Sequence, residues 1–164
     1  MIVVDLGCAH QAGMDSLFTL WERFSPDILY GFDPLWTAEM ETPPRCVIRP
    51  SAAWTFDGRV MLGTGAWGMD ATLMKEKAGG GEWEQSRRVP CFDFSRWLRD
   101  LGVAAVVKMD IEGAEYLILS KMIEDGTDRL MSLLLVEWHD DKMPGMEPER
   151  LRLLSELACE VEGW

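Results

Sequence analysis

The chain alternates short apolar runs with segments in which apolar residues recur at helical spacing. The apolar runs predict buried strands at residues 2–6, 28–32, 46–49, 104–109, 131–138 and 159–161. The periodic segments between them predict helices at residues 17–24, 94–101, 114–123 and 148–157. Strands and helices that alternate in this way are typical of βαβ units, so we predict an α/β fold with a mostly parallel sheet flanked by helices.

The pattern weakens in the middle of the chain. Residues 59–62 predict one more strand, which would pair beside the strand at 46–49 after the Asp57-Gly58 turn. From Gly63 to Arg88 the sequence consists of glycines interleaved with Trp and Met, and long segments of this kind in compact domains are often functional. We therefore predict a single domain over residues 1–164, with residues 63–88 as a flexible insertion.

Charge and composition exclude several classes of protein. Hydrophobic residues make up 48% and charged residues 27% of the 164 residues, which is typical of a globular domain. A net charge of -12 repels polyanions, so no nucleic-acid partner is expected. No apolar run is long enough for membrane insertion. Four scattered cysteines and the absence of a basic leader favour the cytoplasm, or the host cytoplasm for a viral chain.

Small residues connect the first predicted strand to the first helix, from Gly7 to Gly13. In an open α/β sheet, ligands bind beyond the carboxyl ends of the strands, where glycines let the backbone approach them. Asp33 ends the second predicted strand, where a carboxylate can accept the hydroxyl groups of an adenosine ribose. A capping role before Pro34 is the alternative for this residue. The turn and the carboxylate together predict a cofactor that contains adenosine.

The residues of the turn distinguish between two such cofactors. A dinucleotide-binding turn has the pattern G-x-G-x-x-G, but Ala9 stands at the position of the second glycine. Asp5, on the preceding strand, would repel a pyrophosphate, whereas it would attract the amino and sulfonium groups of S-adenosylmethionine. The charge therefore favours the methyl donor, and a nicotinamide oxidoreductase is the rival hypothesis.

Four motifs follow one another along the chain: Asp5-Leu6-Gly7 with Gly13, Tyr30-Gly31-Phe32-Asp33-Pro34, Val107-Lys108-Met109-Asp110-Ile111-Glu112-Gly113-Ala114-Glu115, and Leu135-Val136-Glu137-Trp138-His139. In this order they resemble the FkbM-type methyltransferases, and the K-x-D-x-E-G-A-E block is the most specific of them. The resemblance implies a Rossmann-like class I methyltransferase fold, S-adenosylmethionine as donor, and O-methylation of a sugar, a glycan or a related small molecule.

The resemblance also sets expectations for the cofactor site and for the edge of the sheet. Cofactor contacts are expected from Asp5, Gly7, Cys8, Ala9, Gly13, Asp33, Pro34, Ala53 and Asp110. The antiparallel strand that is usual at the far edge of this fold is expected to be absent or supplied otherwise. The chain would then be a minimal version of the fold or part of a longer glycan-modifying protein.

The predicted catalytic residues are Asp110, Glu112, Glu137 and His139, which follow the fourth and fifth strands of the motif order. Residues two apart in an extended segment face the same side, so each pair can point into one cleft. A hydroxyl acceptor must lose its proton, and a histidine oriented by Glu137 suits a general base. The same four residues are candidates for a divalent metal, Mg or Mn, that would position and acidify the hydroxyl. An acidic helix start is the structural alternative for Asp110 and Glu112.

Three residues are predicted on the substrate side. Lys108 shares the face of Asp110 and is expected to bind substrate, to neutralise the carboxylates or to form a structural ion pair. Trp54 and Trp67 lie in or beside the irregular segment and suit stacking on sugar faces, or else they pin that segment to the sheet. Residues 63–88 would then be the acceptor-side loop. N-methylation, another small-molecule acceptor, and a non-catalytic cofactor-binding module stay open as alternatives.

Overall fold

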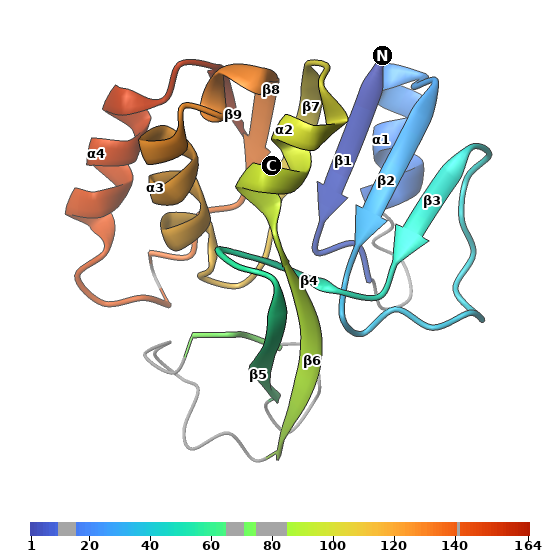
Figure 1. Cartoon of the computed structure of the whole chain (residues 1–164), viewed down its shortest axis with the longest axis horizontal. Helices are drawn as coiled ribbons and strands as arrows, with labels where there is room; N and C mark the ends of the chain where they lie inside the picture. Colours follow the sequence, from blue (N-terminus) through green and yellow to red (C-terminus); the bar gives the residue numbers. More distant parts are fainter. Residues whose placement is uncertain (10–15, 65–70, 75–84, 141) are drawn as a thin grey trace.

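The computed structural model of the protein describes residues 1–9, 16–64, 71–74, 85–140 and 142–164 (Figure 1). Along the chain its elements are β1 (Ile2–Leu6), α1 (Ser16–Phe24), β2 (Ile28–Phe32), β3 (Cys46–Arg49), β4 (Ala52–Trp54), β5 (Gly58–Thr64), β6 (Gln85–Asp93), α2 (Phe94–Leu101), β7 (Ala105–Met109), α3 (Glu115–Asp125), a 3-10 helix η1 (Asp128–Leu130), β8 (Met131–Val136), α4 (Glu147–Glu156) and β9 (Glu160–Gly163). Among these described elements, no helix combines the length and the apolar character that a bilayer span requires.

The main sheet has six strands in the order β3-β2-β1-β7-β8-β9, and each neighbouring pair is parallel. This confirms the predicted α/β fold with a parallel sheet flanked by helices, and the order is compatible with a Rossmann-like fold. The chain runs outward from β1 to β3 on one side and from β7 to β9 on the other. The order therefore reverses between β1 and β7. Within the described residues no antiparallel strand joins this sheet.

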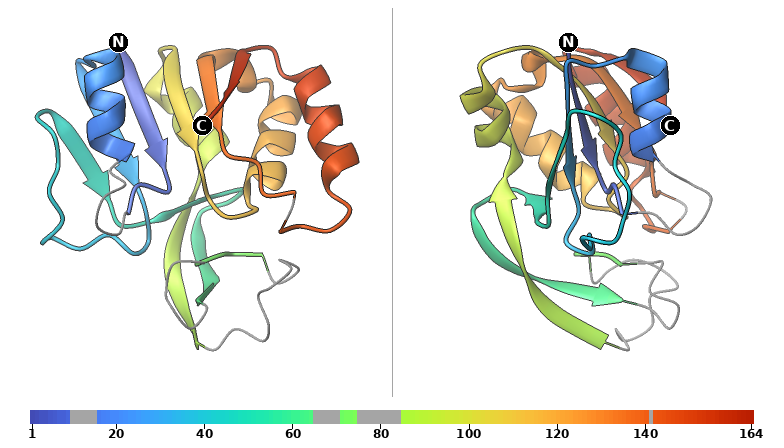
Figure 2. Two further views of the ribbon diagram at one scale, coloured as in Figure 1. Left: turned by 180° about the vertical axis from the view of Figure 1, so that it is seen from behind. Right: turned by 90° about the vertical axis from the view of Figure 1, so that its right-hand side faces the viewer.

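Alternate side chains of the strands point to opposite faces, and each face has its own core. Val4 and Val107 belong to the larger cluster, which contains residues of α2, α3 and α4. Val3 and Val106 belong to the smaller cluster, which contains Leu17 and other residues of α1. The right-hand view of Figure 2 shows the same division, with α1 on one side of the sheet and α2 and α3 on the other. The helices thus enclose the sheet and leave the carboxyl ends of its strands for a site.

A second sheet, with the order β4-β6-β5, lies beyond the carboxyl ends of β1, β2 and β3 (Figures 1 and 2). The predicted pairing of residues 59–62 beside β3 is wrong, because β5 pairs with β6 in antiparallel register. β6 also starts at Gln85, so residues 85–88 of the predicted insertion are a strand. Most of the rest of that insertion, at 65–70 and 75–84, lies outside the described residues. The second sheet therefore lies along the carboxyl edge of the main sheet, an arrangement that periodicity did not predict.

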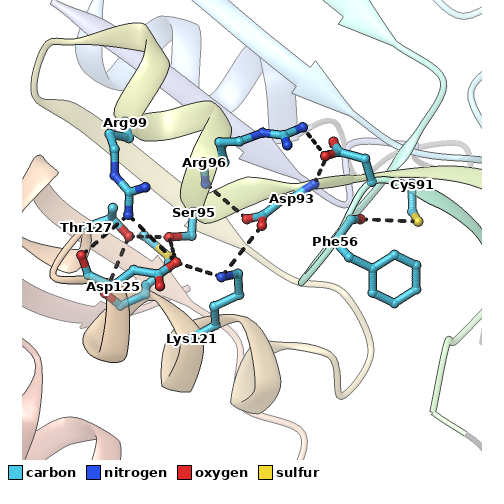
Figure 3. A network of polar contacts seen from close by, with 11 residues as sticks. Phe56, Cys91, Asp93, Ser95, Arg96, Arg99, Lys121, Asp125 and Thr127 are labelled. Carbon is cyan, nitrogen blue, oxygen red and sulfur yellow. Dashed lines mark hydrogen bonds and ion pairs between the residues drawn. The ribbon is translucent and has the colours of Figure 1, made fainter.

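A polar network ties the start of α2 to the end of α3 (Figure 3). Asp93 caps α2 by accepting the Arg96 backbone N–H at 3.0 Å, a contact typical of an N-cap. The Ser95 hydroxyl donates to Asp125 at 2.6 Å and lies 2.7 Å from the Thr127 hydroxyl. Because β6 leads directly into α2, these contacts also hold the base of the second sheet.

Candidate active site at the carboxyl edge of the sheet

The turn after β1 packs directly against the chain that leaves β7. Gly7 has a φ of +83°, and a Cβ there would lie only 1.8 Å from the Asp110 carbonyl oxygen. Its backbone N–H donates to the Phe32 carbonyl at 2.9 Å, and the Asp110 N–H donates to the Leu6 carbonyl at 3.1 Å. Only glycine fits both the conformation and the space. The turn therefore lies at the reversal of strand order, where open α/β sheets bind ligands.

Asp33 lies at the carboxyl end of β2, next to this turn. Its carboxylate accepts the Ala9 N–H at 3.0 Å and the Leu35 N–H at 2.7 Å, and the residue is only 8% exposed. Burial raises the pKa of the Asp33 carboxyl to about 6, against the lowering effect of the two hydrogen bonds. Each oxygen keeps a lone pair beyond its backbone contact, so the carboxylate can accept hydroxyl groups from a ligand.

Asp5 and Lys108 form a buried ion pair on the α1 side of the sheet. They are register partners on β1 and β7, and Lys108 Nζ lies 3.1 Å from Asp5 Oδ1, 3.4 Å from Asp110 Oδ2 and 2.9 Å from the Gly7 carbonyl oxygen. Ser16, the first residue of α1, donates its hydroxyl to Asp5. Burial acts to lower the pKa of the Lys108 ammonium, but the Asp5 and Asp110 carboxylates outweigh it and raise the pKa.

This burial decides between the roles predicted for Lys108. The side chain is 1% exposed, so its contacts are those of a group that neutralises Asp5 and anchors the turn, and an acceptor substrate has no access to it. Asp5 itself is 0% exposed and already has a cation. Asp5 therefore shapes the turn after β1 through Ser16 and Lys108, and the carboxylates that face the carboxyl edge are those of Asp33 and the residues after β7 and β8.

His139 lies at the centre of the predicted catalytic residues. Its Nε2 atom is 3.8 Å from Asp110 Oδ1, 3.5 Å from Glu112 Oε2 and 4.0 Å from Glu137 Oε1. The imidazole is 2% exposed, whereas the Glu137 side chain is 48% exposed. Burial acts to lower the pKa of His139, but the hydrogen bond that the imidazole donates to Glu115, together with the nearby carboxylates, outweighs it and raises the pKa. The structure thus brings all four predicted catalytic residues together around one imidazole nitrogen.

The residue that orients this imidazole is Glu115, and not Glu137 as predicted from the sequence. Glu115 is 0% exposed and its Oε1 lies 3.1 Å from His139 Nδ1. Its carboxylate also accepts the backbone N–H groups of Ile111 at 2.7 Å and Gly113 at 2.8 Å. Glu115 ends the K-x-D-x-E-G-A-E block and opens α3, where an acidic residue is equally typical of a simple dipole partner, so the sequence did not indicate its contact with His139.

A segment of the irregular region reaches the same loop. Thr72 forms a bridge with Gly63 of β5, and its buried hydroxyl donates to the Glu112 carbonyl at 2.6 Å. Glu112 has a φ of +57°, which is uncommon for a residue with a side chain. The contact from Thr72 supports this backbone conformation. Periodicity gave no signal for Thr72, because its role depends on a tertiary contact.

The remaining predicted contacts are distributed around the turn. Cys8 is buried beside Gly31, where a Cβ would lie 2.9 Å from its sulfur, and burial raises the pKa of its thiol. Pro34 accepts a hydrogen bond from Arg87 of β6 through its carbonyl. Ala53 of β4 is 5% exposed, and the neighbouring Trp54 is half-buried with its ring 6.5 Å from that of Phe56. Their cofactor and substrate roles stay predictions.

Two predicted site residues lie outside the described residues: Gly13, expected at the cofactor, and Trp67, expected at the acceptor. Comparison of the chain with protein-family models, with curated proteins and with solved structures found no match. The functional argument therefore depends on the chemistry of the site.

Proposed function

We propose that this chain is an S-adenosylmethionine-dependent O-methyltransferase that acts on a hydroxyl of a sugar, a glycan or a related small molecule. The observation that carries the proposal is the row of carboxylates along the carboxyl edge of the sheet. Asp33 follows β2, Asp110 and Glu112 follow β7, and Glu137 follows β8. The resemblance of the four motifs to FkbM-type methyltransferases points to the same activity.

The order of these carboxylates matches the parts of the donor. Asp33, beside the glycine turn, suits the ribose of the adenosine, because each of its oxygens can accept a hydroxyl. Asp110 lies on the other side of the turn, where the methionine part with its sulfonium and amino groups would extend. Its carboxylate is about a quarter exposed, so it can be reached by a ligand.

The excess of negative charge disfavours the nicotinamide alternative. The strand order is shared with dinucleotide-binding folds and does not separate the two cofactors. The charge does separate them, because two unit charges about 5 Å apart interact by about 3 kcal/mol at an effective dielectric constant of about 20. A pyrophosphate at the turn would meet this repulsion from Asp110, whereas a sulfonium would gain the corresponding attraction.

The cluster around His139 supplies the second requirement of O-methylation. A hydroxyl must lose its proton as it attacks the methyl group, and Glu112 and Glu137, whose side chains are 21% and 48% exposed beside the buried Nε2 of His139, can receive that proton. Glu115 holds the ring so that Nε2 faces Glu112 and Glu137. The second sheet, in which Trp54 ends β4, lies beyond the same strand ends, on the side where the acceptor would lie.

Calorimetry with S-adenosylmethionine, S-adenosylhomocysteine and NAD tests the donor. The proposal expects saturable binding of the two sulfur compounds and none of NAD, with affinity for S-adenosylmethionine at least about tenfold weaker in Asp33→Ala. Asp100→Asn removes an exposed carboxylate at the end of α2 and serves as the matched control, which should leave the affinity unchanged. Unchanged affinity in Asp33→Ala would contradict the proposed ribose contact.

A labelled-methyl assay against a glycan panel tests the transfer. O-methylation requires removal of a proton, so Glu112→Gln and His139→Ala should each lower turnover by about a hundredfold while leaving donor affinity within about twofold. Nearly intact turnover in both variants would favour a nitrogen acceptor. Donor binding without transfer to any acceptor would favour a non-catalytic module.

A further inference from the structure

Three atoms with lone pairs, one each from Asp110, Glu112 and His139, converge beside α3. Glu115 accepts from His139 through Nδ1, which places the ring proton on Nδ1 and leaves Nε2 as an acceptor. Nε2 faces Asp110 Oδ1 at 3.8 Å and Glu112 Oε2 at 3.5 Å, and it has no hydrogen-bond partner among the described residues. The imidazole is 2% exposed, so this nitrogen is buried and aimed at two carboxylates. Such an arrangement can hold a positive charge at its centre.

The spacing of the atoms fits a metal ion better than a proton. A protonated Nε2 would draw a carboxylate to about 2.7–2.9 Å, but both carboxylate oxygens lie well beyond that distance. Two ligand atoms on one cation with bonds of about 2.1 Å, at angles of about 110–130°, are separated by about 3.4–3.8 Å. The ligand atoms of the three residues all lie within 4.8 Å of one another. The gap is therefore of the size that a small cation occupies.

The contact with Glu115 is a second feature typical of metal sites. Histidine ligands almost always donate their other ring N–H to a carboxylate or carbonyl, which fixes the tautomer and the orientation of the ring. Glu115 is itself fixed by two backbone N–H groups and is fully buried. Lys142 Nζ approaches Glu112 Oε2 at 3.5 Å from the more exposed side, and its side chain is 37% exposed. An ammonium at that position offsets part of the charge of Glu112.

We propose that Asp110, Glu112 and His139 bind one divalent transition-metal cation, with Glu115 holding the imidazole. The nitrogen ligand favours an ion of the manganese, iron or zinc class over Mg²⁺ or Ca²⁺, which prefer oxygen ligands alone. Three protein ligands leave coordination positions open. An acceptor hydroxyl would take one of them and lose its proton more easily, with Glu137, which is not among the ligands, receiving the proton, a consequence that rests on the proposed methyl transfer.

Titration with Mn²⁺ alone, followed by electron paramagnetic resonance of the free ion, tests the site without donor or acceptor. We expect one site per chain whose affinity falls at least about tenfold in His139→Ala and about 10–100-fold in Glu115→Gln. Asp100→Asn controls for loose binding to an acidic surface and should leave the affinity unchanged. Equal Mn²⁺ affinity in the wild type and His139→Ala would overturn the proposal. Because the methyl donor is absent from this titration, a failure to bind Mn²⁺ would not contradict the methyltransferase proposal. In the same way, a failure to bind S-adenosylmethionine would not contradict the metal site.

A second measurement does not depend on whether a His139 variant folds. The chain has two histidines, His10 and His139, so a pulsed experiment on the Mn²⁺-bound wild type can detect coupling to an imidazole nitrogen. The coupling should persist in His10→Ala if His139 is the ligand. Its absence from the wild type, or its loss in His10→Ala, would show that His139 does not bind the ion.

Discussion

Asp33 carries a charge that folding buries, so the stability of the protein should depend on pH through this residue. Replacement of Asp33 by Asn removes that dependence and makes it measurable. Burial raises the pKa of this carboxyl from 3.8 to about 6, and the residue is 8% exposed. A shift of about 2 pKa units corresponds to about 3 kcal/mol. The folded protein binds the Asp33 proton more tightly than the unfolded chain does. Protonation of Asp33 therefore raises the free energy of unfolding at low pH. This stabilisation disappears as the pH rises from about 4 through about 6.

Urea unfolding of the wild type and Asp33→Asn between pH 4 and pH 8 tests this reasoning. Over that range the wild type should lose about 2–3 kcal/mol relative to the variant, because all other titrating groups are common to both. The NH2 group of the Asn side chain will face one of the backbone N–H groups of Ala9 and Leu35, and this loss of a hydrogen bond lowers the stability of the variant. Because the loss is the same at every pH, it does not affect how the difference in unfolding free energy changes with pH. Asp100→Asn should run parallel to the wild type. A difference between wild type and Asp33→Asn that stays constant with pH would refute the burial of a charged Asp33.

Three further substitutions test the contacts of the site. In the same urea experiment, Gly7→Ala should lower the free energy of unfolding by more than about 3 kcal/mol, because its Cβ would lie 1.8 Å from a backbone oxygen. Gly126 is the control, because it also has a positive φ, +67°, but a Cβ there would have no atom within 4 Å. Gly126→Ala should therefore lower the free energy of unfolding by only about 1–2 kcal/mol. Lys108→Met leaves Asp5 buried without its cation and should lower the free energy of unfolding by about 3–5 kcal/mol. Adding Asp5→Leu in the double variant should recover part of this loss. Glu115→Gln should lower the turnover of labelled methyl donor by at least about tenfold without changing donor affinity, because the imidazole loses its orientation. Equal costs for the two glycine variants, a neutral Lys108→Met, or unchanged turnover in Glu115→Gln would each contradict the corresponding contact.

Much of the main sheet was predictable because its strands and helices have strong periods of their own. The strands at 2–6, 28–32 and 46–49 have the predicted bounds. β8 ends at Val136, two residues before the predicted end, because the chain leaves the sheet there and carries Glu137 and His139 to Asp110 and Glu112. Functional loops commonly begin at such strand ends.

The second sheet was not predictable in the same way. β6 contains Pro90 and the Arg87-Arg88 pair, which argue against a strand in the middle of a sheet. In the structure β4 pairs with β6 only from Cys91 onward, so Pro90 lies where β6 has a neighbour on one side only. The pairing of β5 with β6 spans a long separation in sequence, and no local pattern encodes such a partner.

The candidate site was predicted at the level of its residues but not of its contacts. The sequence placed Asp110, Glu112 and His139 at strand ends, and the structure brings their ligand atoms together. It could not identify Glu115 as the partner of the imidazole, because an acidic residue in a first helical turn has several equivalent explanations. It likewise left the role of Lys108 open, since only burial separates an anchoring lysine from one that binds a ligand.

The central claim is that carboxylates at successive strand ends receive a positively charged methyl donor. Equilibrium dialysis of the wild-type chain against methyl-labelled S-adenosylmethionine tests it most directly. The account predicts one saturable site per chain, from which S-adenosylhomocysteine displaces the label and NAD does not. No retained label, or displacement by NAD, would contradict it.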